Sequence, residues 1–116
     1  MPLRGEVWLV DLDPTKGHEQ RKMRPCVIVS NDAMNRGRGL SIVIPFTSTP
    51  LILKSGKLSP LQIEIRPPEG GTNKLSYSLA YQVRTVDHSR FIKKLGALSD
   101  SKLTEVVHTL HALTSP

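Results

Sequence analysis

The sequence has only one cysteine, Cys26, among its 116 residues, so no internal disulfide bond can form within it. Cys26 lies in a short apolar run, where a thiol behaves as a small buried hydrophobic side chain. A catalytic thiol needs a basic, partly exposed setting instead. Arg24 is close enough in the sequence to leave that alternative open, but we expect Cys26 to belong to the core.

Long hydrophobic runs are also missing. No apolar stretch approaches the ~20 residues with which a helix spans a bilayer, and the N-terminus lacks the pattern of a secretory signal peptide. We therefore expect a cytoplasmic protein. The sequence has no internal repeat, low-complexity segment or linker, and its length fits one domain that comprises residues 1–116.

Motifs for bound cofactors and metal ions are absent as well. The sequence contains neither a P-loop nor a dinucleotide-binding fingerprint, and its four histidines show no zinc-like spacing with cysteine. His108 and His111 lie three positions apart on an expected helix and could share a site, although a solvated helix face is the preferred explanation. We therefore expect no cofactor and no metal-dependent catalysis.

Positive charge is in excess. Sixteen lysines and arginines against ten acidic residues give a formal net charge of +6 and a sequence pI near 9.8. A small basic domain favours a polyanionic partner, with nucleic acid as the leading candidate. The alternative is an ordinary soluble domain with a mildly basic surface, because no run of lysine or arginine exceeds two residues.

Two short apolar runs, residues 7–10 and 26–29, enclose a polar loop of residues 13–25. Apolar runs of this length with β-branched residues predict buried strands, so we expect a long hairpin with its most charged residues at the connecting end. Arg24 precedes Pro25, and a residue before proline is driven to extended backbone. Arg24 should therefore lie at the mouth of the second strand.

Three more strands are expected. Residues 40–46 form the next one, in which Pro45 marks an edge position, a bulge or the last residues of the strand. Residues 61–66 alternate between apolar and polar side chains and predict a half-buried strand. Residues 77–86 predict the last long strand, and residues 91–98 stay uncertain. One face of the last long strand should collect three side chains: Leu79, Tyr81 and Val83.

Two helices are expected around these strands. Asn31 or Asp32 caps a single turn, whereas Ser99 caps a longer helix whose first turn carries Asp100. Residues 67–73 should form a mobile loop. In the long helix an apolar stripe recurs at helical spacing and should pack on the sheet, namely Leu103, Val106, Val107, Leu110 and Leu113. The opposite face should carry Lys102, Glu105, His108 and Thr109. Short strands with one terminal helix predict a small, mostly antiparallel barrel.

Several stretches, in order along the chain, together resemble the MazF/PemK/Kid family of toxin endoribonucleases. They are Arg4-Gly5-Glu6-Val7-Trp8-Leu9-Val10, Gly17-His18-Glu19-Gln20, Arg24-Pro25-Cys26-Val27-Ile28-Val29-Ser30, Pro45-Phe46-Thr47-Ser48 and Gln82-Val83-Arg84-Thr85-Val86-Asp87. The resemblance implies a mostly β fold, an SH3-like small barrel of the CcdB/PemK type with a C-terminal α-helix. It also implies the toxin of a type II toxin–antitoxin system.

RNA cleavage of the implied kind needs no metal ion, because the ribose holds its own 2′-hydroxyl beside the phosphorus. The protein must move two protons and stabilise charge on the phosphoryl oxygens. Arg24 suits the last role, since guanidinium binds phosphate in a bidentate manner, and Thr47 adds a neutral donor. By resemblance, Arg24 and Thr47 match the catalytic pair of the family. The alternatives are a salt bridge from Arg24 to Glu19 and a turn hydroxyl for Thr47.

Other residues are expected to contact the RNA. Within the polar loop His18 titrates near neutrality, and in the Kid branch of the family a histidine in this setting belongs to the active site. We favour stacking or positioning of RNA by His18 over proton transfer. The remaining substrate-binding candidates are Glu19, Gln20, Gln82 and Arg84.

The sequence departs from the family at two places. An arginine and an aspartate act as base and acid in the Kid branch, but Leu79 and Tyr81 occupy those positions and cannot do that work. The stretches that precede the Gln82 strand are also altered, to Lys74-Leu75 and Tyr77-Ser78. These changes affect loop conformation and base preference.

The sequence and the resemblance therefore predict a metal-independent, sequence-selective endoribonuclease that cuts single-stranded mRNA. The expected products are 2′,3′-cyclic phosphate and 5′-hydroxyl ends, and the expected partners are a MazE/PemI-like antitoxin and a second copy of the chain. One rival is a non-enzymatic inhibitor that binds a protein, as the gyrase poison CcdB does. Another is an inactive nucleic-acid-binding barrel.

Overall fold

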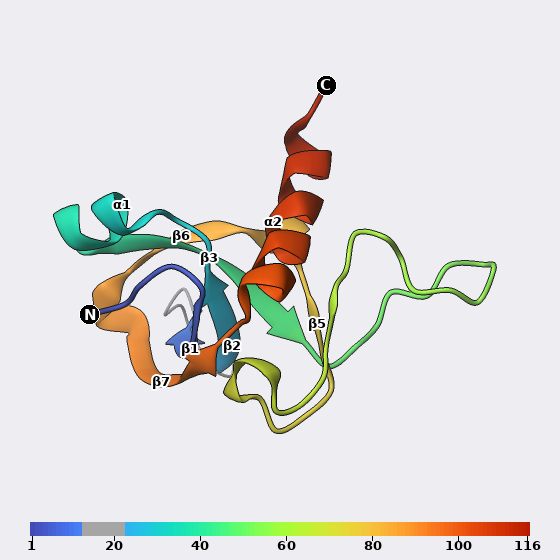
Figure 1. Cartoon of the computed structure of the whole chain (residues 1–116), viewed down its shortest axis with the longest axis horizontal. Helices are drawn as coiled ribbons and strands as arrows, with labels where there is room; N and C mark the ends of the chain where they lie inside the picture. The colour runs from blue at the N-terminus through green and yellow to red at the C-terminus, as the bar shows by residue number, and fades with distance from the viewer. Residues whose placement is uncertain (13–22) are drawn as a thin grey trace, which may run out of the picture.

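A curled antiparallel sheet dominates the computed structural model, which describes residues 1–12 and 23–116 (Figure 1). Seven strands in these residues pair in the order β4-β5-β3-β2-β1-β7, and β6 pairs with β3 beside this path. The C-terminal helix α2 (Asp100–Thr114) lies across the sheet (Figure 1). No helix in the described part of the chain is long and apolar enough to cross a bilayer.

The predicted hairpin is confirmed. Strands β1 (Glu6–Asp11) and β2 (Met23–Ile28) pair antiparallel, with Val10 opposite Arg24. Arg24 is the second residue of β2 and lies at its mouth, as the following proline predicted. The loop that carries His18, Glu19 and Gln20 lies outside the described residues.

Strand β3 (Leu40–Thr47) changes partners along its length. Its first part pairs with β6 (Arg84–Asp87), its middle with β2, and its end with β5 (Ser76–Ser78). Pro45 lies near the end of β3, as one of the predicted alternatives had it, and its carbonyl oxygen accepts a hydrogen bond from Leu79 N at 2.9 Å. The strand thus bends from one part of the curled sheet into the other.

The expectation of a strand over residues 61–66 was largely wrong. Only β4 (Glu64–Ile65) pairs, with β5. Gln62 should have faced solvent by alternation, yet it is 3% exposed and its Oε1 accepts a hydrogen bond from Leu51 N at 2.7 Å. The amide is buried because it satisfies the backbone at the base of the excursion formed by residues 51–59.

The expectation of one long strand over residues 77–86 was also wrong. A 3₁₀ turn, η2 (Ala80–Gln82), separates β5 from β6. Leu79 N donates to Pro45 O, and Gln82 N donates to Leu79 O at 2.9 Å, so the chain bulges out between β5 and β6, which both pair antiparallel with β3. As a result Leu79 is buried whereas Tyr81 is 52% exposed, and the two side chains do not share a face.

Strand β7 (Phe91–Ala97) closes on β1 and resolves the uncertain segment. The loop over residues 67–73 contains one regular element, the 3₁₀ turn η1 (Glu69–Gly71), which packs on β7. Another 3₁₀ turn, η3 (His88–Arg90), follows β6. The short helix α1 (Asp32–Gly37) begins at Asn31, whose side chain accepts a hydrogen bond from Met34 N.

Ser99 caps α2 as predicted, since its hydroxyl accepts a hydrogen bond from Lys102 N. Most of the predicted apolar stripe faces the sheet, but Leu113 is 38% exposed because the helix extends beyond it. Thr109, expected on the solvent face, is 4% exposed. Its hydroxyl donates to Val106 O at 2.6 Å, which satisfies the buried oxygen within the helix.

The core has two parts, one on each face of the sheet. One packs Val7, Val27 and Phe46 against α2, and the other contains Val10, Cys26 and Ile28. Cys26 is fully buried, and this burial raises the pKa of its thiol to about 12, although the charges of Arg84 and Arg24 oppose the rise. The prediction that Cys26 is a core side chain is confirmed.

Candidate active site

Arg24 and Thr47 end up together through the register of β2 and β3. Cys26 pairs with Pro45, Val27 with Ile44 and Ile28 with Val43. Arg24 and Thr47 each lie two residues beyond the Cys26–Pro45 pair, where an extension of this register would place them opposite one another. Because side chains alternate along strands, both lie on one face of the sheet. Both residues line two neighbouring cavities, which therefore meet at this pair.

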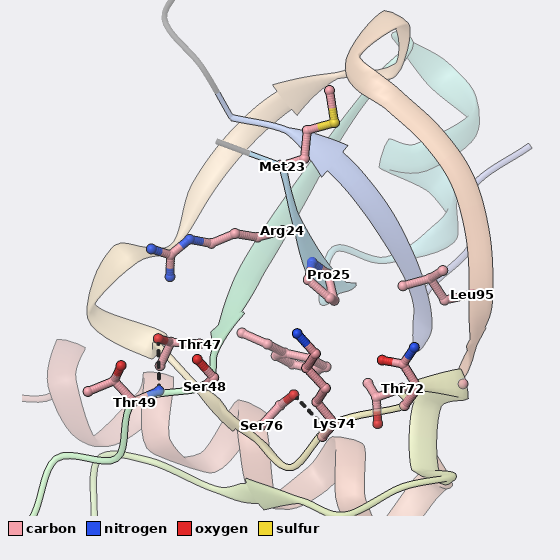
Figure 2. A pocket seen from close by; sticks show the side chains of 13 residues that line it. Met23, Arg24, Pro25, Thr47, Ser48, Thr49, Thr72, Lys74, Ser76 and Leu95 are labelled. Carbon is pink, nitrogen blue, oxygen red and sulfur yellow. Dashed lines mark hydrogen bonds between the residues drawn. The ribbon is translucent and has the colours of Figure 1, made fainter. Parts of the chain in front are cut away.

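The guanidinium of Arg24 is available for a ligand within the described structure. The side chain is half-buried and extends towards Thr47 and Thr49 (Figure 2). No carboxylate of residues 1–12 or 23–116 pairs with it, since the ion pairs in those segments join other residues. The alternative partner Glu19 lies outside the described residues.

The hydroxyl of Thr47 is oriented by its own turn. Thr49 N donates to Thr47 Oγ1 at 3.2 Å (Figure 2). A hydroxyl has one proton to donate and can accept through its lone pairs. With the oxygen already accepting from the backbone, the proton of Thr47 remains free to donate to an anionic oxygen. The turn that was an alternative role for Thr47 is thus compatible with a role in binding phosphate.

The first cavity, hereafter the nucleotide cavity, has a volume of about 450 Å³ and opens on one side of Arg24. Pro25 and Phe46 supply apolar surface. Within the described part of the chain its charged lining residues are Arg24 and Lys74, and none is acidic. Five hydroxyl groups also line it, from Thr47, Ser48, Thr49, Thr72 and Ser76. Cations with hydroxyl donors form an environment suited to phosphate oxygens.

The second cavity is smaller, about 200 Å³, and lies on the other side of Arg24 and Thr47. Gln82 lines it, so the structure brings this predicted RNA contact to the catalytic candidates. Tyr81 lines it too, with an exposed ring. An exposed aromatic ring beside an amide and a guanidinium can stack on a base while the amide reads its edge.

Arg84 is placed differently from Gln82. It lines neither cavity, and its Nη1 donates to Leu12 O at 3.3 Å. Its exposed side chain thus lies where β1 leaves the described structure.

Sequence reasoning missed the two residues that complete these cavities. Lys74 was noted only as a departure in loop sequence, and Tyr81 only as unable to act as an acid. Each is exposed and lines one of the two cavities. A lone lysine in a loop and a tyrosine in an expected strand carry no distinguishing pattern, so only the fold could assign them.

Comparisons with known proteins point to one family. A family model described as PemK-like, MazF-like toxin of type II toxin–antitoxin system matches residues 3–114. Endoribonuclease MazF9 from Mycobacterium tuberculosis is 34% identical over 115 residues, covering 95% of this chain and 93% of that protein. Endoribonuclease MazF from Staphylococcus saprophyticus is 39% identical over 106 residues, with 91% and 85% covered.

Solved structures show the same fold. MazF from Deinococcus radiodurans superposes with a TM-score of 0.76 at 28% identity, covering 99% of this chain and 97% of that one. A mycobacterial endoribonuclease in complex with its cognate antitoxin reaches 0.78 at 24% identity, covering 100% and 98%. The predicted mostly β fold, a curled sheet with a C-terminal helix, is confirmed.

Proposed function

Since the chain belongs to the family of PemK-like, MazF-like toxins of type II toxin–antitoxin systems, we propose that it is an endoribonuclease whose catalytic pair is Arg24 and Thr47. The observation that carries the assignment is their meeting point between two cavities, where no ion pair of residues 1–12 or 23–116 uses the guanidinium and Thr47 Oγ1 accepts from the backbone. Residues 1–116 form the single toxin domain.

The reaction uses the substrate's own nucleophile. The 2′-oxygen attacks phosphorus while the bond from phosphorus to the 5′-oxygen breaks, which leaves a 2′,3′-cyclic phosphate and a 5′-hydroxyl. Arg24 stabilises the charge on the phosphoryl oxygens and Thr47 donates a hydrogen bond to them. Because the nucleophile is internal, no metal ion is needed to generate it. The 2′-hydroxyl loses one proton and the departing 5′-oxygen gains one, so the protons balance, and water relays the proton between the two oxygens.

Proton transfer cannot rest on Arg24 alone, because arginine keeps its proton at neutral pH. For His18 we prefer stacking or positioning of RNA over proton transfer. Glu19 and Gln20 belong to the same loop sequence as His18, whereas Gln82 and Arg84 come from a distant part of the sequence. We assign all five to RNA binding. Single-stranded RNA is the substrate class, because unpaired bases can be splayed and read on their edges.

The rival function is a CcdB-like inhibitor that binds a protein and cleaves nothing. That function does not call for a guanidinium and a hydroxyl meeting between two cavities. Cleavage of mRNA would stop translation and growth, and it would take place in the cytoplasm, where we place the protein.

A free ribonuclease of this kind needs a partner that inhibits it. We propose a MazE/PemI-like cognate antitoxin, which binds by placing an acidic segment on the basic side chains around Arg24. MazF from Deinococcus radiodurans has been solved together with MazE. We also propose a two-fold dimer with RNA across the interface. Antitoxin peptide and an uncleavable RNA should then exclude one another, whereas a stable ternary complex would show that the peptide acts elsewhere.

A cleavage assay on a long RNA of mixed sequence tests the function. We expect discrete cuts in the presence of EDTA, with cyclic phosphate and 5′-hydroxyl ends. An oligonucleotide with 2′-deoxyribose at the scissile position should bind and resist cutting. A 5′-phosphate product or strict dependence on magnesium would exclude the mechanism, and an intact RNA would favour the protein-binding rival.

A further inference from the structure

The nucleotide cavity carries a second cation besides Arg24. Lys74 belongs to the loop between η1 and β5, and its side chain extends into the cavity (Figure 2). We propose that Lys74 binds the phosphate next to the scissile one, so that the nucleotide between Arg24 and Lys74 occupies this cavity. The proposal deepens the proposed function and rests on it, because it assumes that RNA lies on Arg24.

The surroundings of Lys74 fit a phosphate. Among residues 1–12 and 23–116, no acidic residue lines the nucleotide cavity and no ion pair uses the ammonium group of Lys74. A lysine in a hydroxyl-lined cavity, with no carboxylate partner in these residues, is a point charge that can bind an anion. The cavity's volume of about 450 Å³ falls within the range of ligand-binding pockets.

The backbone under Lys74 is fixed on both sides. After it, Ser76 Oγ donates to Lys74 O at 3.0 Å, and Ser76 pairs with Ile65 in β4. Before it, the buried Thr72 donates through Oγ1 to Glu69 O at 2.9 Å. These hydrogen bonds hold the backbone on both sides of Lys74, so its ammonium group extends from a fixed position in the cavity wall. A preorganised position reduces the cost of ordering on binding.

The position of the cavity favours RNA as the occupant. Arg24, Thr47 and Thr49 line both cavities. An RNA strand whose scissile phosphate is bound to Arg24 therefore extends into one cavity in one direction and into the other cavity in the opposite direction. Hydroxyl groups along the nucleotide cavity can bond ribose as well as phosphate oxygens. Carboxylates of an acidic peptide accept hydrogen bonds from the same donors, so the test below also measures the binding of such a peptide.

Lys74→Gln tests the proposal with an RNA made uncleavable by 2′-deoxyribose at the scissile position. We expect about tenfold weaker binding, as for loss of one charge-assisted hydrogen bond. The slope of log affinity against log salt concentration should fall by about 1. With cleavable RNA, KM should rise while kcat stays within about twofold. Lys74→Arg should retain affinity, because it keeps the charge.

Lys54→Gln is the matched control. Lys54 is an exposed lysine in the excursion of residues 51–59, and it lines neither cavity. Lys54→Gln removes the same charge from the protein as Lys74→Gln does. Because Lys54 lies outside both cavities, the RNA affinity of this variant and its slope against salt should stay close to those of the wild type. An equal change in both variants would show a general effect of net charge and overturn the proposal.

A scan with uncharged methylphosphonates locates the contact. Each phosphate near the scissile position is replaced in turn, and affinity is measured for the wild type and for Lys74→Gln. At one flanking phosphate the wild type should lose affinity and Lys74→Gln should lose nothing more. If Lys74→Gln lost as much affinity as the wild type at every substituted phosphate, the proposal would be overturned. It would also be overturned if Lys74→Gln bound an acidic antitoxin peptide more weakly but bound RNA with unchanged affinity. Failure of the wild type to cut RNA would refute the proposed function instead.

Discussion

Gly71 lies directly against Leu95: a β-carbon on Gly71 would stand 1.9 Å from the Leu95 carbonyl oxygen. This contact sets the loop after η1 on β7, and both residues line the nucleotide cavity. Gly71 also has φ +74°, which favours glycine. We expect Gly71→Ala to lower the free energy of unfolding by more than the ~1–3 kcal/mol typical of overpacking, as measured by urea denaturation.

Gly56→Ala is the control for that substitution. Gly56 has a similar φ of +86°, but a β-carbon there would meet nothing within 4 Å. Gly56→Ala should therefore lower the free energy of unfolding only by the cost of left-handed backbone, about 1–2 kcal/mol. Equal destabilisation in the two variants would mean that the contact with Leu95 is not what restricts Gly71.

Arg24→Ala should reduce RNA cleavage by ~10²–10³, the usual effect of removing one preorganised donor to a developing anion. Arg24→Lys should recover little, because an ammonium lacks the planar fork of a guanidinium. The readout is the initial rate of cleavage at saturating RNA. Arg38, an exposed arginine after α1 that lines neither cavity, provides the control Arg38→Ala. Near-normal cleavage by folded Arg24→Ala would refute the assignment.

Thr47→Val removes the hydroxyl while it keeps the shape of the side chain. A hydrogen bond to a charged group is worth about 1.5–3 kcal/mol, so cleavage should slow by roughly ten- to hundredfold. Thr47→Ser keeps the donor and should keep most of the rate. If both variants lost the same activity, shape rather than the hydroxyl would be what matters at this position.

Tyr81→Ala should weaken binding of uncleavable RNA by roughly five- to hundredfold, because stacking of a base on an aromatic ring is worth ~1–3 kcal/mol. The exposed ring lines the second cavity beside Gln82. Tyr81→Phe preserves the ring and should bind and cut as the wild type does. Loss of cleavage in Tyr81→Phe, with binding intact, would point to proton transfer by the phenol and against stacking.

Cys26 should make stability fall in alkaline solution. Burial raises the pKa of its thiol from 9.0 to about 12. A group whose pKa is higher in the folded state contributes stability that is full below pH 9.0 and declines as pH rises towards about 12. Cys26→Ala removes this group, so its stability should decrease less between pH 8 and pH 10.5. Parallel decreases, measured by denaturation at both pH values, would contradict the prediction.

Local patterns in the sequence were enough for the elements whose neighbours lie close along the chain. The apolar runs around Val7 and Val27 predicted the hairpin, since burial on both faces leaves such a run no other position. Asn31 and Ser99 predicted helix starts, because a capping side chain bonds to its own first turn. Arg24 could be placed at a strand mouth from the proline that follows it.

Tertiary structure decided what depends on distant partners. Leu79 leads into the turn that interrupts the expected strand because its backbone donates to Pro45, and Gln62 is buried because Leu51 needs its acceptor. Neither partner is near in the sequence, so alternation alone predicted longer strands than those that form. The same bends bring Lys74 and Tyr81 to the two sides of Arg24. The chemistry of the proposed catalytic pair could thus be predicted from the residue types of Arg24 and Thr47. The cavities around the pair could not, because they form only where separate strands and loops come together.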